Sequence, residues 1–142
     1  MNTALIVPTA LALSACVAAP LPSPTGGRLM QKLVVSGSLT YRQRVSLEPG
    51  SVAQVIIIDV SIADKAELMV ASQTLPLGTR QVPIPFQFEV DRGRLQPNHR
   101  YALRGSVSDS DGNVTWTTTT ARLVDVSQTR AEMGELNMVQ VR

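Results

Sequence analysis

Hydrophobic and polar residues alternate along much of the chain, most clearly in 101–108 (YALRGSVS) and 114–119 (VTWTTT). Each segment places apolar side chains on one face and polar side chains on the other. A period of two predicts β-strands. The intervening 109–113 (DSDGN) is rich in turn-forming residues, and Gly112 is free to adopt a positive φ. We therefore expect the two strands to form a hairpin.

β-Branched and alternating apolar residues predict further strands. Their expected ranges are 33–41 (continuing through 44), 51–60, 85–90 and 136–141, with 123–126 as an extension of the sheet. The run 51–60 (SVAQVIIIDV) is almost continuously apolar, which predicts that both of its faces are covered. Pro49 and Gly50, just before it, suit the centre of a type II turn.

Four segments have weaker patterns. Residues 66–75 (AELMVASQTL) contain strong helix formers, but strands on either side leave little room for a helical crossover. We expect a strand there, with a helix as the alternative. A turn is expected at 76–80, and the two prolines of 82–85 predict an extended segment at a sheet edge. The polar segment 128–135 is expected to form a short helical turn.

Together these elements predict an all-β fold, a single antiparallel β-sandwich or barrel of about seven to eight strands. The domain is expected to span 33–142, which is long enough to bury one hydrophobic core. Trp116, Phe86 and Phe88 are expected to lie in that core.

The N-terminal segment 1–15 has a different character, because an uncharged apolar run ends just before Cys16, the single cysteine of the chain. The order Leu13, Ser14, Ala15, Cys16 resembles a bacterial lipobox. That resemblance implies cleavage before Cys16, a diacylglycerol on its sulfur and acylation of the new amino group. Residues 1–15 are then a lipoprotein signal peptide. The alternative is an apolar N-terminal helix with a buried free cysteine, although the run is shorter than the roughly 20 residues that span a bilayer.

Residues 16–32 are predicted to form a flexible tether between the lipid and the domain. Three prolines favour extended backbone, and a Gly-Gly pair loosens the end of the segment. Membrane lipid, held through acylated Cys16, is the expected partner at this end of the chain. Val17 follows Cys16 where aspartate would signal retention in the inner membrane. By resemblance, this favours the periplasmic face of the outer membrane.

Composition excludes several classes of function. The formal net charge is +2, from 13 Lys and Arg against 11 Asp and Glu, and the basic residues are spread along the chain, so we expect no nucleic-acid partner.

His99 is the only histidine, hence the only base for a Ser-His-Asp relay, and we expect it to pack in a loop. Asp109 and Asp111 resemble the start of a calcium loop, but Thr120 stands where the last acidic ligand would be. We therefore expect no catalytic residue, metal or cofactor, and no enzyme activity.

Two features are candidates for contact with a partner. Arg42 and Arg44 are expected on one face of the first strand, where they contact a partner or, alternatively, pair with Asp59 or Glu89 across the sheet. The threonine-rich row 115–120 would accept an added strand if it lies at an edge.

Four segments resemble one lipoprotein family in type and order, namely 35–64, 81–90, 98–112 and 114–120. The chain resembles the YbaY family of small bacterial lipoproteins, which is related to the YscW-type lipoproteins. The YscW-type proteins are pilotins, which guide secretin subunits of type III secretion systems to the outer membrane. The resemblance implies a β-sandwich, a lipid anchor and no catalytic residues.

The expected function is that of a membrane-anchored, non-catalytic lipoprotein that binds an outer-membrane protein as its client, like a pilotin or chaperone. Binding would occur by strand addition or by docking of a short segment. The alternative is a small-molecule-binding, glycan-binding or structural lipoprotein of the cell envelope. A concave pocket with converging polar groups would favour that alternative.

Overall fold

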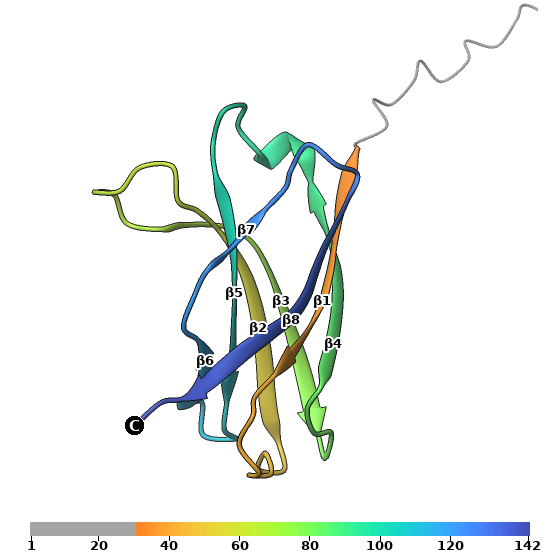
Figure 1. The fold of residues 1–142 in the computed structure, drawn as a ribbon, viewed down its shortest axis with the longest axis vertical. Coiled ribbons are helices and arrows are strands. Elements are labelled where there is room, and N and C mark those ends of the chain that lie inside the picture. Colours follow the sequence, from red (N-terminus) through yellow and green to blue (C-terminus); the bar gives the residue numbers. More distant parts are fainter. Residues whose placement is uncertain (1–30) are drawn as a thin grey trace, which may run out of the picture.

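The computed structural model describes residues 31–142, which are almost entirely β (Figure 1). Its elements are β1 (Lys32–Thr40), β2 (Ser51–Asp59), β3 (Leu68–Gly78), β4 (Ile84–Asp91), the 3-10 helix η1 (Arg92–Arg94), β5 (Tyr101–Ser108), β6 (Val114–Thr118), β7 (Arg122–Val124) and β8 (Arg130–Gln140). The predicted signal peptide 1–15, the lipidated Cys16 and nearly all of the tether 16–32 lie outside the described residues.

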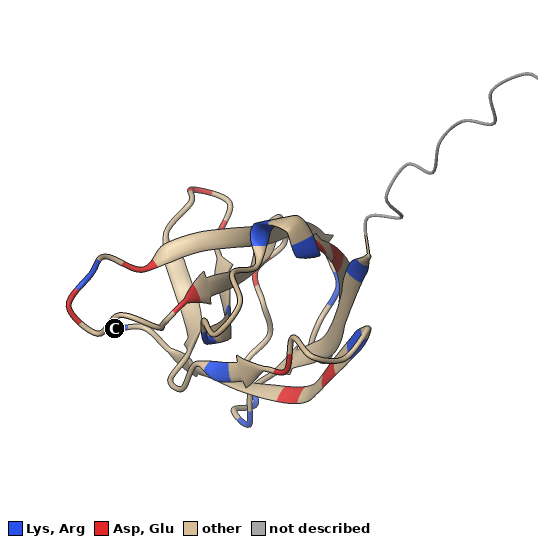
Figure 2. Cartoon of the chain, turned by 90° about the horizontal axis from the view of Figure 1, so that it is seen from above, with Lys and Arg blue, Asp and Glu red and all other residues tan. Residues whose placement is uncertain are grey.

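The strands form one sheet in the order β3-β2-β5-β6-β8-β1-β4, and β7 pairs with β5 off this path. Viewed from above, the sheet curls almost into a closed ring, with charges of both signs distributed around it (Figure 2). The edge strands β3 and β4 meet where Gln73 Nε2 donates to the Gln87 carbonyl at 3.0 Å. The prediction of an all-β fold is confirmed. Pairing is antiparallel except between β1 and β8, which run parallel.

Alternation along the strands builds the core, because every second side chain points into the rolled sheet. Inward residues with 0–1% exposure include Leu33, Val35, Leu39, Ala53, Val55, Ile57, Val90, Tyr101, Leu103 and Val107. Trp116, Phe86 and Phe88 are also buried, as predicted. The apolar run of β2 is covered on both faces at its end, where neighbouring Ile57 and Ile58 are both buried. Within residues 31–142 no helix has the length and apolar character that a membrane span requires.

Two local predictions were wrong. The turn expected at 76–80 begins later, because β3 continues to Gly78 and pairs with β2 along its length. The helical turn expected at 128–135 is instead the first half of β8. Its Ala131 and Met133 are buried two residues apart, and β1 pairs with this half of the strand, so the strand register outweighs the local polar character.

The turns predicted at Pro49-Gly50 and at 109–113 and the predicted edge are confirmed. Gly50 (φ 83°) and Gly112 (φ 89°) both lie in the left-handed region, and the 109–113 hairpin closes with Asp109 N donating to the Asn113 carbonyl at 2.9 Å. The proline segment 82–85 leads into β4, which is an edge strand. The threonine row 115–120 is not at an edge along β6, because β6 lies between β5 and β8.

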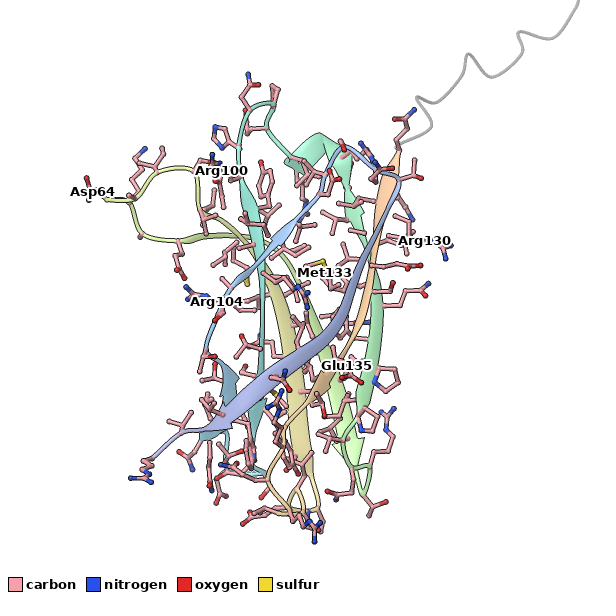
Figure 3. All side chains as sticks on the ribbon, in the orientation of Figure 1. Asp64, Arg100, Arg104, Arg130, Met133 and Glu135 are labelled. Carbon is pink, nitrogen blue, oxygen red and sulfur yellow. The ribbon has the colours of Figure 1, made fainter. Side chains whose placement is uncertain are left out.

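The β2–β3 loop projects sideways from the rolled sheet, with Asp64 at its tip (Figure 3). Its base is fixed to the residue just before β5, because Val60 N donates to the Arg100 carbonyl at 2.8 Å. Ile62 and Leu68, near the two ends of this loop, are 51% and 67% exposed.

Candidate functional site

A cleft opens in the sheet between β7 and the middle of β8. The ladder between β6 and β8 ends at the pair Thr118–Met138, and β7 pairs only with β5. Two irregularities separate these strands. The chain bends at 119–121 between β6 and β7, and β8 carries a bulge at Gly134, whose φ is 66°. Such a bulge bends a strand and stops regular pairing.

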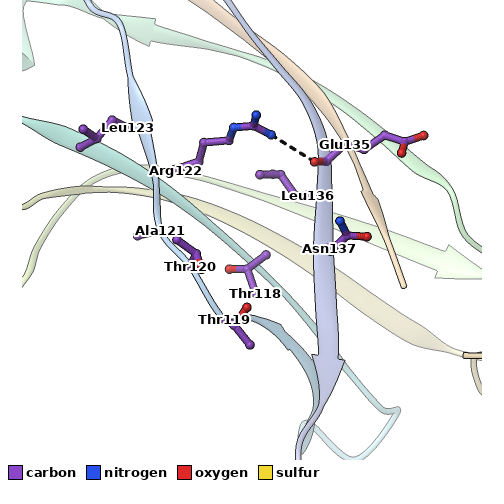
Figure 4. Close-up of a pocket in the computed structure, with 9 residues that line it drawn as sticks. All are labelled: Thr118, Thr119, Thr120, Ala121, Arg122, Leu123, Glu135, Leu136 and Asn137. Atoms are coloured by element: carbon purple, nitrogen blue, oxygen red, sulfur yellow. Dashed lines mark hydrogen bonds between the residues drawn. The ribbon is translucent and has the colours of Figure 1, made fainter. Parts of the chain in front are cut away.

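The cleft has a volume of about 610 Å³, which is in the range of ligand sites. Its lining combines polar and apolar side chains (Figure 4). The lining residues are Thr118, Thr119, Thr120, Ala121, Arg122, Leu123, Glu135, Leu136 and Asn137. Thr118 and Leu136 are buried at its floor, while most of the other side chains face solvent. The cleft thus combines hydroxyl, amide and guanidinium groups with two leucines, buried Leu136 and exposed Leu123.

Backbone groups of β8 point into this cleft. Val141 N donates to the Thr115 carbonyl on β6 at 2.8 Å. Because backbone groups alternate in direction along a strand, the N–H and C=O of Glu135 point to this same side. On this side of β8 no strand pairs with Glu135, and Arg122 Nη1 donates to the Glu135 carbonyl at 3.2 Å instead (Figure 4). One side-chain hydrogen bond therefore occupies a ladder position that a strand would normally fill.

The other open edge, between β3 and β4, is closed more firmly by side chains. Gln73 donates to the Gln87 carbonyl, and Arg94 Nη1 donates to the Val70 carbonyl at 3.4 Å. Pro76 and Pro85 lie in these two edge strands and cannot donate to an added strand. Prolines and covering side chains are how proteins protect edges from unwanted pairing. The β7–β8 cleft is accordingly the better site for an extended ligand.

Arg42 and Arg44 do not lie on a strand, which corrects the prediction. Strand β1 ends at Thr40, and both arginines are exposed in the following loop, at the end of the molecule opposite the start of β1 (Figure 1). The expected ion pairs with Asp59 and Glu89 are also absent from the part of the chain described. Asp59 bonds His99, and Glu89 bonds the Lys32 ammonium. Contact of these arginines with a partner stays a prediction.

His99 forms a hydrogen-bonded cluster that fixes a loop. Its Nδ1 lies 2.5 Å from Asp59 Oδ2, and the Ser61 hydroxyl donates to Asp59 Oδ1 at 2.6 Å. Hydrogen bonds from Ser61 and then His99 lower the pKa of Asp59 to about 2. Both Ser61 and His99 thus bond the aspartate, whereas a nucleophilic relay needs the serine to bond the histidine. This cluster holds the base of the β2–β3 loop against Arg100, whose N–H donates to the Ser61 hydroxyl at 2.7 Å.

The acidic hairpin is also explained by local structure. Asp109 accepts hydrogen bonds from the backbone of Asp111 and Asn113, and these bonds, the Asn113 backbone bond foremost, hold its pKa below the ordinary value. Its carboxylate is therefore used within the turn. Among residues 31–142, no three His, Cys, Asp or Glu side chains are grouped in a way that would hold a metal ion.

The cleft residues Arg122 and Glu135 were not identified from the sequence. Both lie in short polar segments that carry no motif, and their proximity depends on long-range pairing. The one usable signal was Gly134 itself, because an isolated glycine in a strand often marks a bulge.

The fold and the cleft define a small all-β domain whose sheet is interrupted at one strand edge. The chain belongs to the YscW family, described as type III secretion system lipoprotein chaperones, whose family model matches residues 30–139.

Known proteins that are similar to this chain include a lipoprotein and a pilotin. The "uncharacterized lipoprotein YbaY" of Escherichia coli K12 is 29% identical over 136 residues, covering 87% of this chain and 72% of the relative. The structure of an alternative pilotin from the type II secretion system of Vibrio cholerae superimposes with a TM-score of 0.70 at 26% identity. It covers 78% of this chain and 98% of the pilotin. The predicted resemblance to YbaY and YscW-type lipoproteins is confirmed.

Proposed function

We propose that this protein is a non-catalytic lipoprotein chaperone of the pilotin type, which binds an extended segment of an outer-membrane protein in the β7–β8 cleft. The observation that carries the proposal is the backbone of Glu135 on β8, which has a side chain where a neighbouring strand belongs. An incoming strand gains main-chain hydrogen bonds there, and the lining side chains supply selectivity. The family and the similarity to a pilotin support the same role.

In this proposal residues 1–15 are removed, and acylated Cys16 anchors the protein to the periplasmic face of the outer membrane. The tether 16–32 leads to β1. The cleft lies beside the middle of β8, away from the residue where β1 begins (Figure 1). A client bound in the cleft therefore lies away from the N-terminal end of β1, and in this proposal the lipid carries client and chaperone to the membrane together.

Site-specific photocrosslinking in cells tests the cleft. A photoreactive residue replaces Thr120, which is exposed in the lining, or Gln87, which is exposed on the remote strand β4. We expect an adduct with one envelope protein from position 120 and none from position 87. A third position, Gln43, tests whether the loop that holds Arg42 and Arg44 also contacts the client. Equal adducts from positions 120 and 87, or none from position 120, would refute a client site in the cleft.

Fractionation tests the anchor. Replacement of the Cys16 thiol in Cys16→Ser is expected to release the protein from the outer membrane and to mislocalise the crosslinked client. Correct assembly of that client in the variant would refute piloting, even if client binding persisted.

A second candidate is a glycan-binding role, which the polar groups in the lining of the cleft favour. The threonine hydroxyls, the Asn137 amide and the Arg122 guanidinium are the hydrogen-bonding groups of its lining (Figure 4). Titration of the protein with soluble fragments of envelope glycan, followed by amide chemical shifts, distinguishes the two. Shifts of Thr119 and Asn137 with a glycan, together with no crosslink from position 120, would favour the glycan role.

A further inference from the structure

We propose that Arg122 selects what enters the cleft, by exchanging the Glu135 carbonyl for a carboxylate on an incoming extended segment. The preferred partner is then a short strand with an acidic side chain beside Arg122 and small residues elsewhere. This inference rests on the proposed function and concerns the chemistry of the client segment.

The charge of Arg122 is available for such a partner. Ion pairs among the described residues join Lys32 to Glu89, Arg104 to Glu67 and His99 to Asp59, and none of them includes Arg122. Its hydrogen bond goes to a neutral main-chain oxygen, while the Glu135 carboxylate is directed away from the cleft (Figure 4). A guanidinium–carboxylate contact is roughly twice as strong as a neutral hydrogen bond and can be bidentate.

The same hydrogen bond obstructs strand addition. The Glu135 carbonyl is the acceptor that the N–H of an added strand would use, so Arg122 must leave before the ladder extends. The exposed Arg122 guanidinium then exchanges the Glu135 carbonyl for water or for an acceptor on the incoming segment, and a carboxylate is the stronger of these two acceptors. An acidic residue supplies that carboxylate, whereas a basic one is repelled and a neutral one gains less.

The lining restricts the other side chains of the segment. Three threonines and Ala121 form one wall, and buried Leu136 closes the floor, within a volume of about 610 Å³. Leu136 already packs in the core at 4% exposure, so inward residues of the incoming strand must be small. The cleft therefore fits a short stretch of threonine, serine, valine or alanine interrupted by aspartate or glutamate.

Two matched peptides test the inference. Each is an acetylated and amidated heptamer of alternating threonine and valine, with either aspartate or asparagine in the centre. Each is titrated into the isotope-labelled full chain carrying Cys16→Ser, and affinity is read from the amide shifts of Glu135 and Asn137. We expect the aspartate peptide to bind at least about tenfold more tightly. Arg122→Gln should remove this preference.

Arg104→Gln is the matched control, because Arg104 is a partly buried arginine on β5 that pairs with Glu67 outside the cleft. That variant should keep the tenfold preference. Equal affinities for the wild type, or a preference that survives Arg122→Gln, would overturn the role of Arg122 and leave strand addition intact. If neither peptide shifts the cleft amides, strand addition in the cleft is refuted and this inference with it.

Discussion

The rings of Tyr41 and Trp116 stack face to face, with centroids 3.9 Å apart and planes inclined by 11°. Tyr41 follows β1 and Trp116 lies in β6, so the contact joins two strands that do not pair with each other. The Tyr41 hydroxyl also donates to the Val45 carbonyl and holds the start of the β1–β2 loop. One buried tyrosine thus fastens this loop to the core.

Removing the Tyr41 ring should cost more than removing its hydroxyl. Tyr41→Phe loses one hydrogen bond, and we expect a loss of about 1 kcal/mol in the free energy of unfolding. Tyr41→Leu also loses the stacked ring, which adds about 0.5–1.5 kcal/mol beyond the area term. Urea unfolding followed by fluorescence of Trp116, the single tryptophan, measures both variants. Equal losses would show that the stack contributes nothing.

Gly105 is required by the packing of Leu39. A Cβ atom at position 105 would lie 2.3 Å from Leu39 Cδ2, and Leu39 is fully buried. We expect Gly105→Ala to destabilise the fold by about 1–3 kcal/mol through overpacking. The check is the double variant Gly105→Ala with Leu39→Val, which should be less destabilised than the sum of the two single variants. Strict additivity of the urea-unfolding energies would contradict a steric cause.

Strands with local alternation could be predicted almost to the residue. The hairpin of β5 and β6 and the strand β4 follow directly from period-two patterns, because successive side chains of a strand point alternately to the core and to solvent. The closure of the sheet could not be predicted in this way. It depends on the parallel pairing of β1 with β8, which are far apart in sequence. Local propensity even indicated a helical turn at 128–135.

Prediction of the candidate site from the sequence was also limited to local motifs. The resemblance to a lipobox at Cys16 is a local sequence pattern, so the sequence alone leads to that prediction. Arg122 and Glu135 carry no motif, and only the bend at 119–121 and the bulge at Gly134 bring them together across the cleft. Arg42 and Arg44 were noticed because of their spacing, yet the chain leaves the sheet one residue before Tyr41 and places them in a loop.

The Asp59 cluster should make stability depend on pH in the acid range. The folded pKa of Asp59 is about 2, against 3.8 for the free side chain. The unfolded chain therefore takes up the proton first, and stability that is complete above about pH 4 is lost as pH falls toward about 2. Asp59→Asn cannot undergo this change, so its urea midpoint should fall less than the wild-type midpoint over that interval. Asp64→Asn, exposed at the loop tip, serves as the control and should retain the wild-type dependence.

The bulge at Gly134 should be needed for both stability and the cleft. Its φ of 66° is unfavourable for residues with a Cβ atom, although nothing lies within 4 Å of where that atom would be. We therefore expect Gly134→Ala to cost about 1–2 kcal/mol from backbone conformation alone. Asparagine tolerates the left-handed region, so Gly134→Asn should cost less.

Hydrogen exchange of the Glu135 amide in the cleft tests whether Gly134 keeps β8 away from β7. If alanine relieves its strain by straightening β8, the Glu135 N–H gains a partner on β7, and its hydrogen exchange should slow relative to the asparagine variant. Exchange is measured under identical conditions, with the Asn113 amide in the distant hairpin as the internal reference. Slower exchange at Glu135 in Gly134→Ala alone would mean that the bulge holds the cleft open. If Gly134→Ala shows the predicted loss of stability but the exchange rate at Glu135 is unchanged, the bulge only accommodates the register shift between β8 and β1.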